Sequence, residues 1–150
     1  MHNDIKLFIN DYWEFAIKHK AYGVHLGQDD LKFADINAIK QNNLCLGIST
    51  HNYHELAYAM SHKPSYIALG PIYPTTTKIM QHNPQGIEKI HIWQELINCP
   101  LVLIGGINLD NIDKILKTGI KNIAVISAIT EASDPETRTK ILLKKISNYV

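Results

Sequence analysis

The sequence has few cysteines, no long apolar run and no excess of charge of one sign. Cys45 and Cys99 are the two cysteines and form no CxxC motif, which argues against thiol chemistry or a disulfide and suits a reducing compartment. Lys and Arg total 15 against 14 for Asp and Glu, so the charge predicts neither a nucleic-acid nor a membrane partner. No run approaches the ~20 apolar residues of a membrane span, and MHNDIKLFIND lacks the features of a signal peptide. These absences predict a cytoplasmic protein.

Three familiar enzyme signatures are also missing. No Gly-x-Ser-x-Gly elbow, Walker loop or Rossmann fingerprint occurs, which argues against acyl hydrolases, P-loop enzymes and dinucleotide enzymes. No Ser/Gly linker or low-complexity tract divides the 150 residues, and 45% of them are hydrophobic, enough for a core. We therefore expect one domain over residues 1–150.

Short apolar runs alternate with longer segments of helical periodicity. Within residues 30–42, DLKFADINAIKQN predicts one helix, and Pro135 is placed where the first turn of a helix tolerates proline. No hairpin signal separates the runs, so the pattern predicts a parallel sheet in an α/β fold. The six predicted strands are residues 7–10, 23–27, 45–50, 66–70, 101–107 and 122–129.

Two architectures fit such a string, an open doubly wound sheet and a closed (β/α) barrel. Polar residues lie where each predicted strand runs into its helix, from Asn10 to Ser127. A barrel builds its active site from all of its strand ends, whereas an open sheet concentrates ligand groups at one switch point. The even spread favours the barrel, although a complete barrel has eight units.

Two aspartates, Asp11 and Asp30, follow neighbouring predicted strands. Two carboxylates at adjacent strand ends can converge on one hard cation, which in turn can hold phosphate oxygens. The alternative is that each aspartate caps a helix, a common role of Asp at such boundaries. The spacing leaves both interpretations open.

Residues 66–78 read YIALGPIYPTTTK, an apolar strand followed by two prolines, three threonines and a lysine. Hydroxyls and N–H groups in a loop stiffened by Pro71 and Pro74 can surround an anion, and Lys78 adds a compact positive charge. The alternative is a polar turn whose threonines bond to their own backbone. The prolines and the lack of a hairpin partner favour the anion site.

Small residues lie at the ends of the last two predicted strands. Gly105 and Gly106 would let a ligand approach the backbone, and Ser127 lies near the end of the final strand. The loops after the seventh and eighth strands of a barrel commonly bind phosphate. Tight packing of a helix on the sheet explains the glycines equally well. His25 lies inside a predicted strand and could point into the barrel.

These motifs together resemble the thiamine phosphate synthase family. The likeness runs from about Leu7 to Ile129, and the segments that carry it are LFINDYWEFAIKHKAYGVHLGQDDL, LGISTHN, YIALGPIYPTTTK, IGGI and IAVISAI. The resemblance implies a TIM (β/α)8 barrel and a transferase that acts on two small molecules with Mg²⁺. That reaction joins 4-amino-5-hydroxymethyl-2-methylpyrimidine diphosphate to a thiazole phosphate, giving thiamine phosphate and pyrophosphate.

The resemblance also implies a role for individual residues. Asn10 and Ser49 would contact the pyrimidine diphosphate, and Asp11 and Asp30 would bind Mg²⁺. Lys78 would pair with the pyrophosphate. Because both contact the pyrimidine diphosphate, Lys78 and Ser49 are the candidate catalytic residues. The thiazole phosphate would be held by Thr75, Thr76, Thr77, Gly106, Ile126 and Ser127.

The chain departs from the family pattern at its start. Family members begin with two further strand-helix units, and their Gln-x-Arg-x-Lys motif, which grips the diphosphate, is absent here. The resemblance therefore implies an N-terminally truncated domain, an incomplete barrel covering strands 3 to 8. Its open strand edges would be covered by a second copy or by a complementing N-terminal chain. The alternatives are a fragment that only binds thiazole phosphate and a protein like the thiazole tautomerases.

Overall fold

The computed structural model describes residues 5–75 and 83–149, which form six strands and eight helices. The chain divides into two compact units, Met1–Ala68 and Leu69–Val150. Every strand is followed by at least one helix, and the strands that pair in register, β1 with β2, β2 with β3 and β5 with β6, are parallel. The predicted α/β fold with parallel strands is confirmed.

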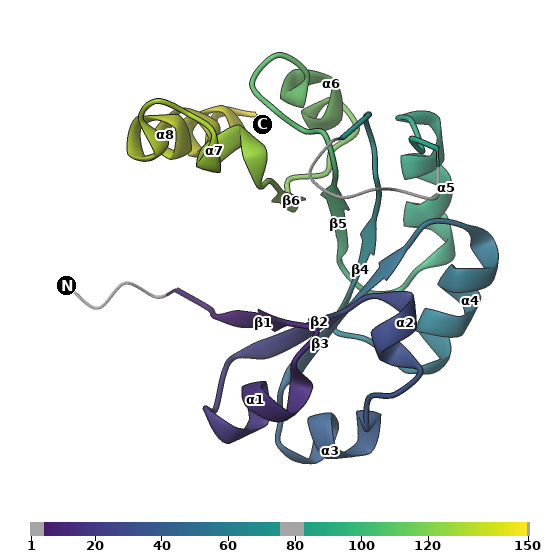
Figure 1. Cartoon of the computed structure of the whole chain (residues 1–150). Helices are drawn as coiled ribbons and strands as arrows, with labels where there is room; N and C mark the ends of the chain where they lie inside the picture. Colours follow the sequence, from purple (N-terminus) through teal and green to yellow (C-terminus); the bar gives the residue numbers. More distant parts are fainter. Residues whose placement is uncertain (1–4, 76–82, 150) are drawn as a thin grey trace. The chain divides into compact units, whose positions relative to one another are not determined.

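The first unit carries four strands, in the sheet order β1-β2-β3-β4. Helix α1 packs on β1 and β2, and α3 and α4 pack on β3; Figure 1 shows α1 and α3 together beneath the strands of this unit. The elements are β1 (Phe8–Asn10), α1 (Trp13–Lys18), β2 (Gly23–Leu26), α2 (Gln28–Leu31), α3 (Ile36–Gln41), β3 (Cys45–Thr50), α4 (Tyr53–Ser61) and β4 (Tyr66–Leu69), whose last residue belongs to the second unit.

The two faces of β2 and β3 differ in chemistry. The register pairs Val24 with Leu46 and Leu26 with Ile48, and all four side chains are buried in the core. Because successive residues of a strand point to opposite faces, His25 lies on the other face, where it is half-buried. One face therefore supplies hydrophobic burial, and the other is available for polar groups.

The prediction of a single helix over residues 30–42 is wrong. The chain instead forms α2 and α3, separated at residues 32–35. The Asp35 carboxylate accepts a hydrogen bond of 2.9 Å from the Ala38 N–H and thereby caps the start of α3. The Asp35 side chain accepts from a backbone N–H that would bond to a backbone carbonyl in a continuous helix. Apolar periodicity does not reveal such an interruption.

The second unit contains two paired strands and four helices among its described residues. Its core includes Trp93, Leu103, Ile112 and Ile115, all completely buried. Pro135 occupies the first turn of the last helix, as predicted. The elements are α5 (Glu88–Leu96), β5 (Leu101–Ile104), α6 (Ile112–Leu116), β6 (Ile123–Ala124), α7 (Ser127–Thr130) and α8 (Pro135–Asn148).

The last two predicted strands, residues 101–107 and 122–129, are too long. Strand β5 ends at Ile104, because Gly105 and Gly106 have φ angles of +94° and +67°, which a strand does not accommodate. Strand β6 ends at Ala124, and the apolar run that follows it turns into α7. Short apolar runs have no period that separates strand from helix, so the sequence alone does not place this boundary.

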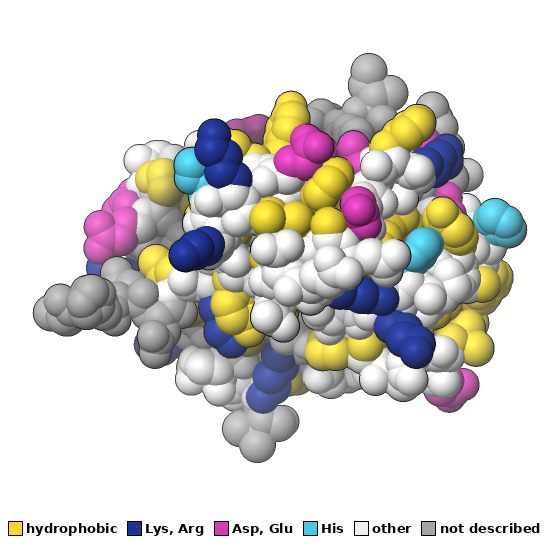
Figure 2. Space-filling view, turned by 90° about the horizontal axis from the view of Figure 1, so that it is seen from below, with side chains coloured by type: hydrophobic (Ala, Val, Ile, Leu, Met, Phe, Trp, Pro, Cys, Tyr) yellow, Lys and Arg dark blue, Asp and Glu magenta, His cyan; other side chains and the backbone are white. Residues whose placement is uncertain are grey.

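The surface is chemically mixed. Figure 2 shows side chains of Lys and Arg, of Asp and Glu, and of hydrophobic residues interspersed over the described part of one face. No helix within residues 5–75 and 83–149 has both the length and the hydropathy needed to cross a bilayer.

Candidate functional site

Asp11 lies directly beside the end of β2. Its N–H donates a 2.8 Å hydrogen bond to the carbonyl of His25, and its backbone has a φ of +64°, a conformation that Asp and Asn tolerate better than most residues. The Asn10 side-chain amide donates to the Asp11 carboxylate at 2.7 Å. The turn after β1 thus holds an amide and a carboxylate next to each other.

Asp30 also lies close to the C-terminal end of β2. It belongs to α2, which begins immediately after β2. A side chain at Gly27 would come within 3.0 Å of an Asp30 carboxylate oxygen, so this carboxylate folds back over the backbone that leaves β2. The two aspartates therefore both border the C-terminal end of β2.

Neither aspartate caps a helix with its side chain. The N-cap of α1 is Tyr12 and the N-cap of α2 is Gly27, and neither helix start has a side-chain capping bond. The capping interpretation of Asp11 and Asp30 is therefore wrong. Their carboxylates remain candidates for ligand chemistry.

The donors around the end of β2 fit Mg²⁺ only in part. Within the described residues, no three His, Cys, Asp or Glu side chains lie close enough together to hold a metal ion. Mg²⁺, however, is commonly bound by one or two carboxylates together with water and substrate phosphates. Asp11 and Asp30 provide two carboxylates, the kind of ligand that such an ion takes from a protein.

Ser49, on the polar face of β3, contacts a histidine that in turn contacts a tyrosine. His25 Nε2 lies 2.8 Å from the Ser49 hydroxyl, and His25 Nδ1 lies 2.9 Å from the Tyr66 hydroxyl. The side-chain amide of Gln28 donates to the Ser49 carbonyl at 2.6 Å. Three neighbouring strands therefore contribute one continuous chain of hydrogen bonds, Tyr66–His25–Ser49.

The Tyr66–His25–Ser49 chain is uncharged at neutral pH. Burial lowers the pKa of His25 to about 4, because the imidazolium form would lose its hydration. Burial likewise raises the pKa of Tyr66 to about 12. A neutral imidazole carries one N–H donor and one acceptor nitrogen, so it can donate to one hydroxyl and accept from the other.

Two glycines create the room for this arrangement. A side chain at Gly47 would lie 2.1 Å from Cζ of Tyr66, and one at Gly23 would lie 2.3 Å from Cε1 of Phe8. The rings of Phe8 and Tyr66 meet edge to face with their centroids 5.6 Å apart, and the Tyr66 and His25 rings are stacked. Sequence reasoning assigned no role to Tyr66. The feature that could have indicated it is Gly47, a glycine on the neighbouring strand that leaves space for the ring.

The burial of His25 predicts a pH dependence of stability. The pKa of His25 is 6.5 in the unfolded chain and about 4 in the folded one, so the unfolded chain binds more protons between these values. The free energy of unfolding is therefore highest above pH 6.5 and falls as the pH approaches 4, by up to about 3 kcal/mol from this residue. Urea unfolding at pH 7 and pH 4.5 should show a smaller pH effect in His25→Gln than in the wild type.

The exposed His19 provides the control for this experiment. His19→Gln should keep the full pH dependence of the wild type. An unchanged pH dependence in His25→Gln would contradict the assignment.

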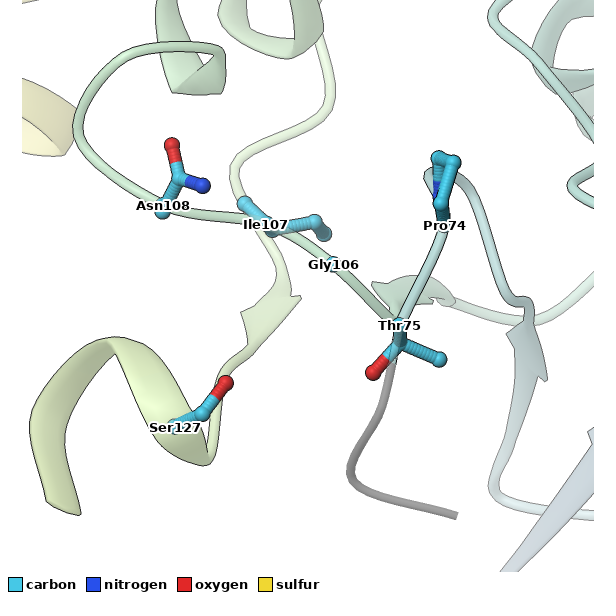
Figure 3. Close-up of a pocket in the computed structure, with 6 residues that line it drawn as sticks. All are labelled: Pro74, Thr75, Gly106, Ile107, Asn108 and Ser127. Carbon is cyan, nitrogen blue, oxygen red and sulfur yellow. The ribbon is translucent and has the colours of Figure 1, made fainter. Parts of the chain in front are cut away.

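A second group of polar residues lines a pocket in the second unit. The pocket is lined by Pro74, Thr75, Gly106, Ile107, Asn108 and Ser127. Figure 3 shows the hydroxyl oxygens of Thr75 and Ser127 turned toward the space between the two side chains. The pocket thus brings together three of the residues to which the family resemblance gives one role, Thr75, Gly106 and Ser127.

Backbone hydrogen bonds fix the segment that leads to Thr75. The N–H groups of Ile72 and Tyr73 donate to the carbonyls of Ile104 and Gly105, at 2.9 and 3.1 Å. The N–H of Gln85 donates to the Pro71 carbonyl at 2.7 Å, which closes the loop at its base. The chain after β4 therefore runs beside the end of β5 until it reaches the pocket.

The opposite wall of the pocket is fixed by Asn111, which the sequence did not single out. Its side-chain amide donates to the Gly106 carbonyl, and its side-chain oxygen accepts from the Asn108 N–H, each at 2.9 Å. At Gly106 a side chain would lie 2.4 Å from the Pro74 carbonyl oxygen. Glycine is therefore required at position 106, both because a side chain would collide with Pro74 and because the backbone has a φ of +67°.

Thr76, Thr77 and Lys78 are outside the described residues. Ile126 precedes α7, is 53% exposed and is not among the residues that line the pocket.

Comparisons with known proteins agree on one family. The family model for thiamine monophosphate synthase matches residues 1–129. The thiamine-phosphate synthase of Proteus mirabilis is 54% identical over 142 residues, which cover 94% of this chain and 66% of that protein. That of Klebsiella pneumoniae is 54% identical over 140 residues, with 92% and 66% covered. The chain thus spans 66% of the length of these two curated relatives.

Solved structures give the same result. A thiamine phosphate pyrophosphorylase from Pyrococcus furiosus matches with a TM-score of 0.82 and 33% identity, covering 98% of this chain and 70% of that one. A 3-hexulose-6-phosphate synthase matches with a TM-score of 0.67, 97% and 75% coverage and only 15% identity, a likeness of fold alone. From the family model and the identity to its curated relatives, we conclude that the chain belongs to the thiamine monophosphate synthase family.

Proposed function

We propose that the chain serves thiamine biosynthesis as a thiamine phosphate synthase, a transferase. It joins 4-amino-5-hydroxymethyl-2-methylpyrimidine diphosphate to a thiazole phosphate and releases pyrophosphate. The observation that carries the proposal is the pocket in which Thr75, Gly106 and Ser127 come together. Two hydroxyls beside a glycine that lets a ligand approach the backbone suit a phosphate group, and the relatives named above are synthases of this kind.

In this proposal the thiazole phosphate is bound by Thr75, Thr76, Thr77, Gly106, Ile126 and Ser127. The pyrimidine diphosphate is bound by Asn10, Ser49 and Lys78. The bond between the pyrimidine methylene carbon and the diphosphate oxygen breaks, and the electron pair leaves with pyrophosphate. The thiazole nitrogen then donates its electron pair to the methylene carbon. Such a reaction asks the protein mainly to position two substrates and to stabilise a charged leaving group.

The metal in this proposal is Mg²⁺, held by Asp11 and Asp30. When bound, it neutralises charge on the diphosphate. The position of both aspartates beside the end of β2 supports this role. Asn10 orients the carboxylate of Asp11 through its 2.7 Å hydrogen bond.

We further propose one barrel-type domain over residues 1–150, corresponding to strands 3 to 8 of a TIM barrel. The likeness to the Pyrococcus furiosus structure over 98% of the chain supports this. Strand β1 ends the sheet order, and beside it Ile5 and Leu7 are 78% and 58% exposed. Strand edges of this kind pair readily, which supports a second copy or a complementing chain as partner. The lack of a CxxC pair supports a cytoplasmic location.

The test is an assay of the purified chain with both substrates and Mg²⁺. We expect thiamine phosphate and pyrophosphate to form in equal amounts, and to form faster when a polypeptide carrying a Gln-x-Arg-x-Lys motif is added. Omitting either substrate or adding a chelator is the control. The absence of product in all mixtures would overturn the proposal.

An alternative is a protein that binds thiazole phosphate without turnover. The pocket in the second unit favours it, because all the described residues that line the pocket belong to that unit. Calorimetry with thiazole phosphate alone distinguishes the two functions: binding without product formation in the assay would support the alternative.

A further inference from the structure

We propose that His25 and Tyr66 are positioning residues that make the Ser49 hydroxyl a hydrogen-bond donor to an acceptor atom of the bound pyrimidine diphosphate. The inference rests on the proposed function, and it concerns two residues that no observation above assigns to the reaction. In the Tyr66–His25–Ser49 chain, His25 contacts the Tyr66 hydroxyl at 2.9 Å and the Ser49 hydroxyl at 2.8 Å.

The surroundings of His25 restrict it to one orientation. Its ring is stacked on Tyr66, with ring centroids 5.6 Å apart and an angle of 16° between the planes. Tyr66 in turn lies close against Gly47, the residue paired with His25 across β2 and β3. Packing therefore holds the imidazole with one nitrogen toward each hydroxyl.

The direction of the hydrogen bonds follows from the acidity of the two hydroxyls. A phenol is a stronger hydrogen-bond donor and a weaker acceptor than an aliphatic alcohol, because its oxygen shares its lone pairs with the ring. The favoured arrangement has the Tyr66 O–H donating to Nδ1 and the Nε2–H donating to the Ser49 oxygen.

The consequence for Ser49 is a fixed polarity. Its oxygen accepts from His25, so the hydroxyl hydrogen is directed away from the imidazole. Phosphate oxygens and the ring nitrogens of a pyrimidine are both acceptors, so a donor at this position is complementary to the pyrimidine diphosphate. With the hydrogen bonds in the opposite direction, the Ser49 hydroxyl would donate to His25. Its oxygen would then present a lone pair to the substrate and repel the same acceptor atoms.

A double-mutant cycle tests the proposal in the full chain. Tyr66→Phe removes the hydroxyl and keeps the ring, and it should lower kcat/KM for the pyrimidine diphosphate about tenfold, the effect of one hydrogen bond. In a Ser49→Ala background, Tyr66→Phe should have less than a twofold effect, because Tyr66 acts only through Ser49. The kinetic constants for thiazole phosphate should be unchanged.

Tyr22→Phe is the matched control, since the Tyr22 ring also packs edge to face on Phe8 and lies outside the hydrogen-bond chain. It should leave all kinetic constants at the wild-type level. Equal effects of Tyr66→Phe in the wild-type and Ser49→Ala backgrounds would overturn the proposal, as would wild-type kinetics in Tyr66→Phe.

A spectroscopic measurement separates this inference from the proposed function. Nitrogen NMR of histidine-labelled protein at pH 7, with His25→Gln for assignment, should show His25 as the neutral Nε2–H tautomer. Tyr66→Phe should shift it toward the Nδ1–H form. The Nδ1–H tautomer in the wild type would refute the inference even in an active enzyme, whereas an inactive wild type with the Nε2–H tautomer would refute only the proposed function.

Discussion

Replacing Asp11 or Asp30 with Asn is expected to lower kcat for thiamine phosphate formation about a hundredfold to a thousandfold, the scale on which losing one charge-stabilising group slows an enzyme. Each change removes one negative ligand with little change of shape. Asn also tolerates the +64° φ of position 11 and has an oxygen that can accept the bond from Asn10. The fold should therefore be kept, and part of the lost rate should return at higher Mg²⁺ concentration.

The measurement is kcat as a function of Mg²⁺ concentration, with thermal unfolding as a check on stability. Asp29→Asn is the matched control, because Asp29 precedes Asp30 in α2 and has a 92% exposed side chain that pairs with Lys32 on the surface. It should retain wild-type activity. A loss in Asp29→Asn equal to that in Asp30→Asn would assign the effect to the charge of α2 rather than to a metal ligand.

Gly106→Ala is expected to reduce kcat/KM for thiazole phosphate about a hundredfold, the cost of displacing a substrate by about 1 Å. The added methyl would lie 2.4 Å from the Pro74 carbonyl oxygen and 2.8 Å from Cβ of Tyr73. Those atoms belong to the segment that brings Thr75 to the pocket, so the clash pushes apart two walls of the site. The KM for the pyrimidine diphosphate should change little.

Gly119→Ala separates this clash from backbone strain. Gly119 also has a positive φ, +83°, but no atom lies within 4 Å of the added methyl. Both variants should lose about 1 kcal/mol of stability through strain, while only Gly106→Ala loses activity. Steady-state kinetics with each substrate varied in turn, together with urea unfolding, measure both quantities. Similar kinetic losses in the two variants would show that strain, and not the pocket, is responsible.

The strands could be predicted from the sequence because each is an apolar run bounded by polar or glycine residues. The prediction failed where local chemistry overrides apolar content. Asp35 starts a new helix with its carboxylate, and the positive φ angles of Gly105 and Gly106 end β5. Neither the capping bond nor the φ angle has a signature in hydrophobic periodicity.

The site could be predicted only where its residues follow strands in the sequence. Asp11 and Asp30 follow strands in the sequence, so a parallel sheet brings them to the same boundary. The contact between Ser49, His25 and Tyr66 depends instead on the register between strands and on the space left by Gly47. Register is a property of paired strands, and no single segment of the sequence contains it.

The fit of Tyr66 against Gly47 has a consequence for how this sheet can evolve. A methyl group at position 47 would overlap the phenol ring. A shorter residue at position 66 would leave a void above the glycine and remove the hydrogen-bond partner of His25 Nδ1. Neither position can change without loss unless the other changes with it. Homologous chains should therefore vary at these two positions as a pair, and a laboratory library would have to randomise both at once to find viable alternatives.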